Sequence, residues 1–151
     1  MSRNLSPNFT LEELTISQTA AREGIDNTPG KDERRNLRTL ARFLEQVRSE
    51  LGDQPIVINS GYRSPALNAA IKGSKTSAHM KGLAADLIVP SHGTVLQTAK
   101  AIAASGLPFD QLIYEMSWIH IGLPSDGQTP RQELLSYGAQ KKYVPGLTSN
   151  C

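Results

Sequence analysis

Residues 74–90 read SKTSAHMKGLAADLIVP, and their last part, AADLIVP, predicts a strand that stops at Pro90. Because side chains alternate between the two faces of a strand, Asp86 interrupts one face of this otherwise apolar segment. A buried carboxylate is costly unless it has a partner. His79 lies in the loop just before the strand, where Gly82 allows a close turn, and it is a candidate partner for the carboxylate.

A second short strand, WIHIGL at residues 118–123, supplies another imidazole. Alternation places Trp118, His120 and Gly122 on one face of this strand and the aliphatic residues on the other. Two histidines and one aspartate form a three-ligand set for a catalytic zinc that keeps its fourth position open. Taken alone the set is weak evidence, because a histidine is more often a hydrogen-bonded polar residue than a metal ligand.

The remaining patterns predict an α+β domain. Apolar residues recur with helical spacing from about residue 32 to 51 and again over 92–106, which predicts two amphipathic helices. The strands at 110–115 and 118–123 are joined by two residues and predict a tight hairpin. We therefore expect a small antiparallel sheet with helices packed on it, in preference to a doubly wound parallel sheet. Weaker patterns predict a further strand at residues 55–60 and short helical segments at residues 8–17, 65–73 and 131–136.

Composition limits the class of protein further. The 151 residues fit a single domain, 1–151, and the net charge of +2 gives no general case for nucleic-acid binding. No run of ~18 apolar residues is present, so we expect no membrane insertion. The first ten residues hold no apolar run, which predicts synthesis in the cytoplasm without a secretory signal. The single cysteine, Cys151, excludes a disulfide within the chain, and a monomer is the default expectation.

Three motifs in order, SGYRS, SAHMKGLAADL and WIH, resemble the D-Ala-D-Ala carboxypeptidase family of zinc peptidases, which shares a fold with the hedgehog signalling domain. The segments LSPNFTLEELTISQTAAREGIDN and SGYRSPALNAAI are similar to the phage and prophage branch of that family. The family pattern is Ser-x-His-x-x-Gly-x-Ala-x-Asp followed later by Trp-x-His. Its positions are matched by Ser77, His79, Gly82, Ala84 and Asp86, and then by Trp118 and His120.

The resemblance implies that His79, Asp86 and His120 hold one zinc ion per chain. It also implies that Arg63, in GYRS, polarises the scissile carbonyl or stabilises its oxyanion. A salt bridge beneath the site is the alternative role for this arginine.

The other implied roles concern the walls of the site. Ser77 either binds the substrate backbone or holds its own loop. Tyr62 and Trp118 either line the cleft or pack in the core. His92, the third histidine, is interpreted as structural or exposed.

The general base is the point at which this chain departs from part of the family. Several relatives carry a carboxylate three residues before the final histidine ligand, where this chain has Ser117. Glu115 is the nearest carboxylate, and the predicted hairpin brings it toward the metal, so we interpret it as the base, with Asp110 or a water network next in line. A surface charge at the end of a strand is the alternative role for Glu115.

These observations support two hypotheses. The first is a zinc-dependent peptidase that hydrolyses peptide bonds of bacterial peptidoglycan, as a D,D-carboxypeptidase or an endopeptidase. It would serve as a phage or prophage lytic enzyme that reaches the wall by holin-type release or as a virion-associated protein. The second is a catalytically inactive, zinc-holding module of the same fold that binds the cell wall.

Overall fold

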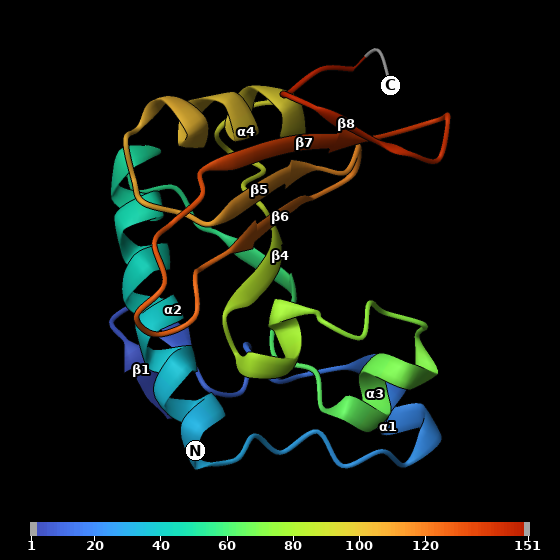
Figure 1. Ribbon diagram of the computed structural model, residues 1–151. Coiled ribbons are helices and arrows are strands. Elements are labelled where there is room, and N and C mark those ends of the chain that lie inside the picture. Colours follow the sequence, from blue (N-terminus) through green and yellow to red (C-terminus); the bar gives the residue numbers. More distant parts are fainter. Residues whose placement is uncertain (1–2, 150–151) are drawn as a thin grey trace.

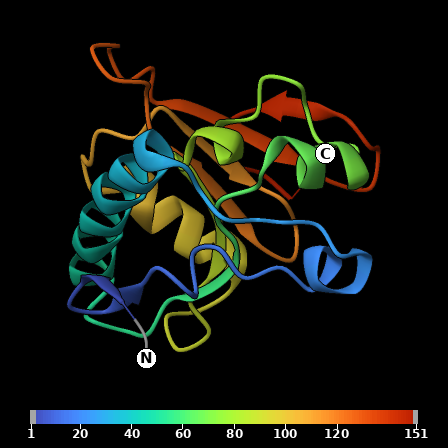
Figure 2. The same ribbon diagram turned by 90° about the horizontal axis from the view of Figure 1, so that it is seen from below.

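A computed structural model describes residues 3–149 and shows helices packed on one face of a sheet (Figure 1). The two longest helices are α2 (Lys31–Glu50) and α4 (Val95–Ala104), and they lie together on that face (Figure 2). The predicted α+β class is therefore confirmed. Two short helices, α1 (Gln18–Glu23) and α3 (Pro65–Ala70), and a 3₁₀ turn, η1 (Ala78–Lys81), complete the helical elements of the described residues.

The main sheet has six strands in the order β3-β4-β6-β5-β7-β8. A separate two-stranded sheet pairs β1 with β2 near the N-terminus. The strands of the main sheet are β3 (Val57–Ser60), β4 (Ala84–Ile88), β5 (Gln111–Tyr114), β6 (Ile119–Gly122), β7 (Glu133–Tyr137) and β8 (Tyr143–Pro145), and those of the small sheet are β1 (Asn4–Ser6) and β2 (Phe9–Thr10).

The core lies between α2, α4 and the covered face of the sheet. Alternation in β6 sends Ile119 and Ile121 into this core, where both are fully buried, while His120 points to the opposite face. Each fully buried aliphatic side chain of this kind stabilises the fold by roughly 1.5–3 kcal/mol. The other fully buried contributors include Leu37, Leu40, Leu44, Leu87, Ile102 and Leu112.

The N-terminal sheet is attached to α2 through one carboxylate. Glu45 accepts hydrogen bonds from Ser6 Oγ at 2.7 Å, Asn8 N at 2.7 Å and Asn8 Nδ2 at 2.8 Å. Burial raises the pKa of Glu45, but these hydrogen bonds outweigh it and leave the pKa below its usual value. The ionised carboxylate therefore helps to hold β1 and β2 in place.

The sheet is mixed and larger than the sequence predicts, because residues 131–136 do not form a helical turn. Instead β7 pairs in parallel with β5, in the register Gln111↔Glu133 to Tyr114↔Ser136. The free edge of β5 offers a row of unpaired backbone groups, and satisfying them overrides the local helical preference of residues 131–136.

The predicted helix at residues 8–17 is also absent, although its capping signal is present. Glu13 N donates to Thr10 Oγ1 at 3.1 Å and Thr10 N donates to Glu13 Oε1 at 2.9 Å, which is the reciprocal capping-box pair. The chain then runs as turns through residues 11–15. This path buries Leu11 and Leu14 in the core and lets Leu14 O accept from Tyr62 N at 2.7 Å.

Candidate metal centre and active site

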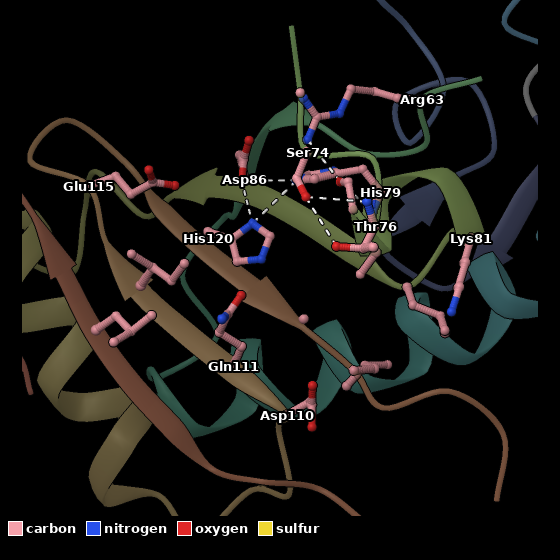
Figure 3. A pocket seen from close by; sticks show the side chains of 18 of the residues that line it. Arg63, Ser74, Thr76, His79, Lys81, Asp86, Asp110, Gln111, Glu115 and His120 are labelled. Carbon is pink, nitrogen blue, oxygen red and sulfur yellow. Dashed lines mark hydrogen bonds and ion pairs between the residues drawn. The ribbon is translucent and has the colours of Figure 1, made fainter. Parts of the chain in front are cut away.

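Two neighbouring strands bring the predicted metal ligands together on the face of the sheet away from α2 and α4. Asp86 of β4 lies directly opposite His120 of β6 in the antiparallel register, and His79 comes from η1, just before β4. Within the described residues, these three side chains form the one cluster whose ligand atoms converge closely enough to hold a metal ion (Figure 3). His92 lies apart from them, with its Nδ1 3.0 Å from Thr98 Oγ1.

The distances between the ligand atoms fit a tetrahedral zinc site. His79 Nε2 lies 3.3 Å from His120 Nδ1 and 3.3 Å from Asp86 Oδ1, and His120 Nδ1 lies 3.0 Å from Asp86 Oδ1. Zinc bonds of about 2.0–2.1 Å at tetrahedral angles place neighbouring ligand atoms about 3.3 Å apart. The donor set of two imidazoles and one carboxylate therefore matches zinc in both its chemistry and its spacing.

A backbone carbonyl fixes which nitrogen of His79 faces the site. His79 Nδ1 lies 2.7 Å from Gly61 O, which can only accept, so Nδ1 carries the proton and Nε2 presents its lone pair. Burial lowers the pKa of His79 and so favours the neutral imidazole that a metal requires. Asp86 stays ionised: burial opposes this, but the neighbouring imidazoles of His120 and His79 hold its pKa far below the usual range.

Gly82 closes the loop between His79 and β4. It has a φ of +75°, and a Cβ at this position would lie 2.7 Å from Glu33 O of α2. The left-handed backbone and the close approach of the helix both require glycine here. The loop is further fixed by Leu83 N, which donates to Ala78 O at 3.1 Å.

Arg63 points one of its nitrogens at the loop that carries His79. Its Nη2 donates to Ser77 Oγ at 3.4 Å, while its buried Nε has no hydrogen-bond partner among the described residues. Burial lowers the pKa of the guanidinium. The carboxylates of Asp86 and Glu115 act in the opposite direction but do not outweigh burial, so the pKa lies below its usual value. A partly buried cation with unused donor capacity beside the metal site is suited to binding a carbonyl oxygen on which negative charge develops.

Glu115 directly follows β5 and begins the predicted turn, and the hairpin between β5 and β6 is confirmed. Glu115 N donates to Trp118 O at 3.0 Å across the turn, and Trp118 Nε1 donates to Glu115 Oε2 at 3.2 Å. Burial raises the pKa of this carboxyl, and the negative charge of Asp86 raises it further. A carboxylate whose pKa is raised toward neutrality is a better general base and general acid than a solvated one.

These groups share an open cleft of about 730 Å³. Seven of the eight predicted site residues line it: Arg63, Ser77, His79, Asp86, Glu115, Trp118 and His120. Tyr62 does not. Its side chain is 5% exposed and packs in the core, because the turn at Leu14 holds its backbone against that part of the molecule.

Ser77 and Asp110 have partners that define their roles. Ser77 Oγ accepts from His79 N at 3.2 Å and caps η1, so it holds the loop as well as facing the cleft. Asp110 lines the cleft but accepts a bidentate pair from Arg131, at 3.1 and 2.9 Å, and this pairing lowers the pKa of Asp110. A carboxylate so engaged is a poor base, which favours Glu115.

Part of the cleft is formed by residues after 123, which the sequence patterns did not predict. Arg131, Leu135 and Tyr143 line the same cavity as the metal ligands. They lie in a Gly- and Pro-rich stretch with no periodicity, and only the non-local pairing of β7 with β5 brings them to the site.

A histidine–aspartate–histidine cluster beside a partly buried arginine and a glutamate of raised pKa provides the groups that a metallopeptidase site requires. Sequence comparison places the chain within that class: it belongs to the Peptidase M15 family, whose profile matches residues 7–122. A stretch of 50 residues is 44% identical to the zinc D-Ala-D-Ala carboxypeptidase of Streptomyces albus G. That stretch is 33% of this chain and 20% of the relative, so the similarity spans a fifth of that protein.

These comparisons and the geometry confirm two predictions, the family of zinc peptidases and the zinc cofactor. The family match also agrees with the structure, because the matched segment, residues 7–122, contains all three ligand residues. Within the described residues, no helix combines the length and apolar character needed to cross a membrane.

Proposed function

We propose that this protein is a zinc-dependent peptidase that hydrolyses peptide bonds in the stem peptides or cross-links of bacterial peptidoglycan. The observation that carries the proposal is the convergence of three metal ligands, Arg63 and Glu115 on one open cleft. The similarity to a carboxypeptidase named for a D-Ala-D-Ala substrate supports the substrate class.

The residues of the cleft have separate roles in hydrolysis. His79, Asp86 and His120 would hold a zinc ion, which would supply a Lewis acid and lower the pKa of water at the site toward ~7. Arg63 donates a hydrogen bond to the carbonyl oxygen as negative charge develops there. Glu115 accepts the proton of the attacking water and transfers it to the leaving nitrogen as the C–N bond breaks. Trp118 holds the carboxylate of Glu115 in place through its indole N–H.

We further propose that the protein is a phage or prophage lytic enzyme. It would reach the cell wall by holin-type release or as part of the virion. The support is the similarity of residues 5–27 and 60–71 to the phage-type branch of the family. A monomer acting on a peptide substrate fits a site built from one chain.

The test is digestion of purified peptidoglycan by zinc-loaded protein, followed by mass spectrometry of the muropeptides. Loss of a terminal alanine would identify a carboxypeptidase, and cleavage within a stem or cross-link would identify an endopeptidase. A chelator and an His79→Ala, His120→Ala double variant are the controls, and both should abolish turnover. Zinc-loaded protein that binds peptidoglycan without cutting it would instead identify the inactive wall-binding module.

A further inference from the structure

The β7–β8 hairpin lies outside the segment that the family profile matches, yet it forms part of the cleft. The profile ends at Gly122, whereas β7 and β8 occupy residues 133–145. Leu135 and Tyr143 of this hairpin nevertheless line the cavity that holds the metal ligands.

The strand register explains how Leu135 reaches the cleft. His120 of β6 lies opposite Ile113 of β5, and Ile113 lies opposite Leu135 of β7. These cross-strand neighbours share one face, so Leu135 extends the floor of the cleft two strands beyond His120, or about 10 Å. That is about three residues of extended peptide, long enough for substrate residues beside the scissile bond.

Tyr143 is placed at the end of the cleft where Glu115 lies. It pairs with Tyr137 across the hairpin, and Tyr137 is one residue beyond Ser136, which pairs with Tyr114. Glu115 is likewise one residue beyond Tyr114, so the two tyrosines are level with Glu115 along the sheet. Glu115 delivers the proton to the leaving nitrogen in the proposed function, which makes this the leaving-group side.

The hairpin holds Tyr143 in a defined position. The fully buried Ser136 donates through Oγ to Gly146 O at 2.8 Å and accepts from Thr148 N at 2.9 Å, which fastens the segment after β8 to β7. The rings of Tyr137 and Tyr143 lie 4.8 Å apart. Tyr143 lines the cleft and is 55% exposed.

We propose that Tyr143 and Leu135 form a substrate subsite on the leaving-group side of the scissile bond. The Tyr143 hydroxyl donates a hydrogen bond to the substrate main chain, and Leu135 contacts an aliphatic side chain of the leaving peptide. This inference rests on the proposed peptidase function. Burial and the Glu115 carboxylate raise the pKa of Tyr143, so its phenol keeps the proton that it donates.

The test compares Tyr143→Phe, which removes only the hydroxyl, with Tyr137→Phe, which removes a hydroxyl from the same hairpin outside the cleft. We expect Tyr143→Phe to raise KM for a muropeptide substrate about 2- to 10-fold with kcat within 2-fold, the effect of one hydrogen bond. Tyr137→Phe should match the parent. The parent should have a higher kcat/KM for substrates whose leaving residue is alanine than for those whose leaving residue is glycine, and Leu135→Ala should reduce this ratio about 10-fold.

Unchanged KM in both Tyr143→Phe and Tyr143→Ala would overturn the subsite, and so would an equal loss in Tyr137→Phe. Failure of the proposed function is distinguished by binding. If zinc-loaded parent protein does not cleave muropeptides, their Kd is measured by calorimetry. Weaker binding by Tyr143→Phe would support the subsite although the peptidase proposal fails. Equal binding, or no binding by the parent, would overturn the subsite.

Discussion

Substituting Gly61 with alanine should weaken zinc binding without touching any metal ligand. The carbonyl of Gly61 accepts the hydrogen bond that orients His79, at 2.7 Å from Nδ1. A Cβ at Gly61 would lie 2.3 Å from Leu14 O, 2.9 Å from Leu14 C and 3.0 Å from Leu14 Cα. These are backbone atoms, so no side-chain rotation can relieve the overlap. Leu14 O also accepts a hydrogen bond from Tyr62 N, which holds it in place.

The size of the effect follows from these distances. A carbon and a carbonyl oxygen in contact lie about 3.3 Å apart, so relieving the overlap requires a backbone shift of about 1 Å. A shift of that size carries the bond between Gly61 O and His79 Nδ1 beyond the ~3.2 Å limit of a good hydrogen bond. Loss of a hydrogen bond that orients a metal-binding histidine typically costs 10- to 100-fold in affinity, or about 1.4–2.7 kcal/mol.

The assay is the Kd for zinc, measured by competition with a chromophoric chelator at one pH, with thermal unfolding of the same samples. Gly122→Ala is the matched control, because a Cβ there would lie 3.6 Å from His120 Nε2, an ordinary contact. We expect the control to bind zinc like the parent. A folded Gly61→Ala protein with a Kd within 2-fold of the parent would refute the role given to the Gly61 carbonyl.

Three further predictions test the catalytic groups and one surface contact. Glu115→Gln should keep zinc, measured by elemental analysis, and lower kcat about 10²- to 10⁴-fold; turnover near the parent rate would mean that another group is the base. Arg63→Ala should keep both zinc and the circular dichroism spectrum yet lose about 10²- to 10³-fold in rate, whereas an unfolded variant would assign Arg63 a structural role. Glu45→Gln should lower the free energy of unfolding in urea at pH 7, because the ionised carboxylate accepts hydrogen bonds from Ser6 and Asn8. The pKa of Glu45 is lower in the folded state than in the unfolded state, so its contribution to the free energy of unfolding is present above the unfolded pKa of ~4.3 and disappears as pH falls through the folded value. The free energies of unfolding of the parent and the variant should therefore become equal in acid. A difference between them that does not depend on pH would contradict this.

The metal centre was predictable because the motifs around His79, Asp86 and His120 resemble those of a known family, and the local strand pattern agrees with that resemblance. His79 and Asp86 lie seven positions apart within one loop and strand, and the alternation of β6 fixes the face of His120. The two-residue turn likewise determined that Glu115 pairs with Trp118. The period of two fixes the face on which each side chain lies, and the short turn fixes the pairing of Glu115 with Trp118, whereas the contact between Asp86 and His120 also needs the pairing of β4 with β6.

The far wall of the cleft was not predictable, because it depends on pairing between distant segments. Residues 133–137 contain Glu133, Leu134 and Leu135, which locally suit a helix, and only the free edge of β5 selects a strand. The sequence left Tyr62 open between cleft and core for a similar reason, since the hydrogen bond from its backbone N–H to Leu14 O, far away in sequence, is what places it in the core. The pair Thr10 and Glu13 shows that a capping signal can form without the helix that usually follows it.

The parallel pairing of β7 with β5 also determines where the sheet stops and how it is protected from other molecules. With β7 and β8 in place, the outer edge is a three-residue strand that ends in Pro145 and follows Lys141 and Lys142. Short length, proline and lysine are features that discourage strand addition from a second chain. A chain cut after Gly122 would instead leave the edge of β5 unpaired, with Leu112 and Ile113 in it, open to intermolecular strand pairing. The hairpin that lines the cleft thus also protects this edge of the sheet from strand addition.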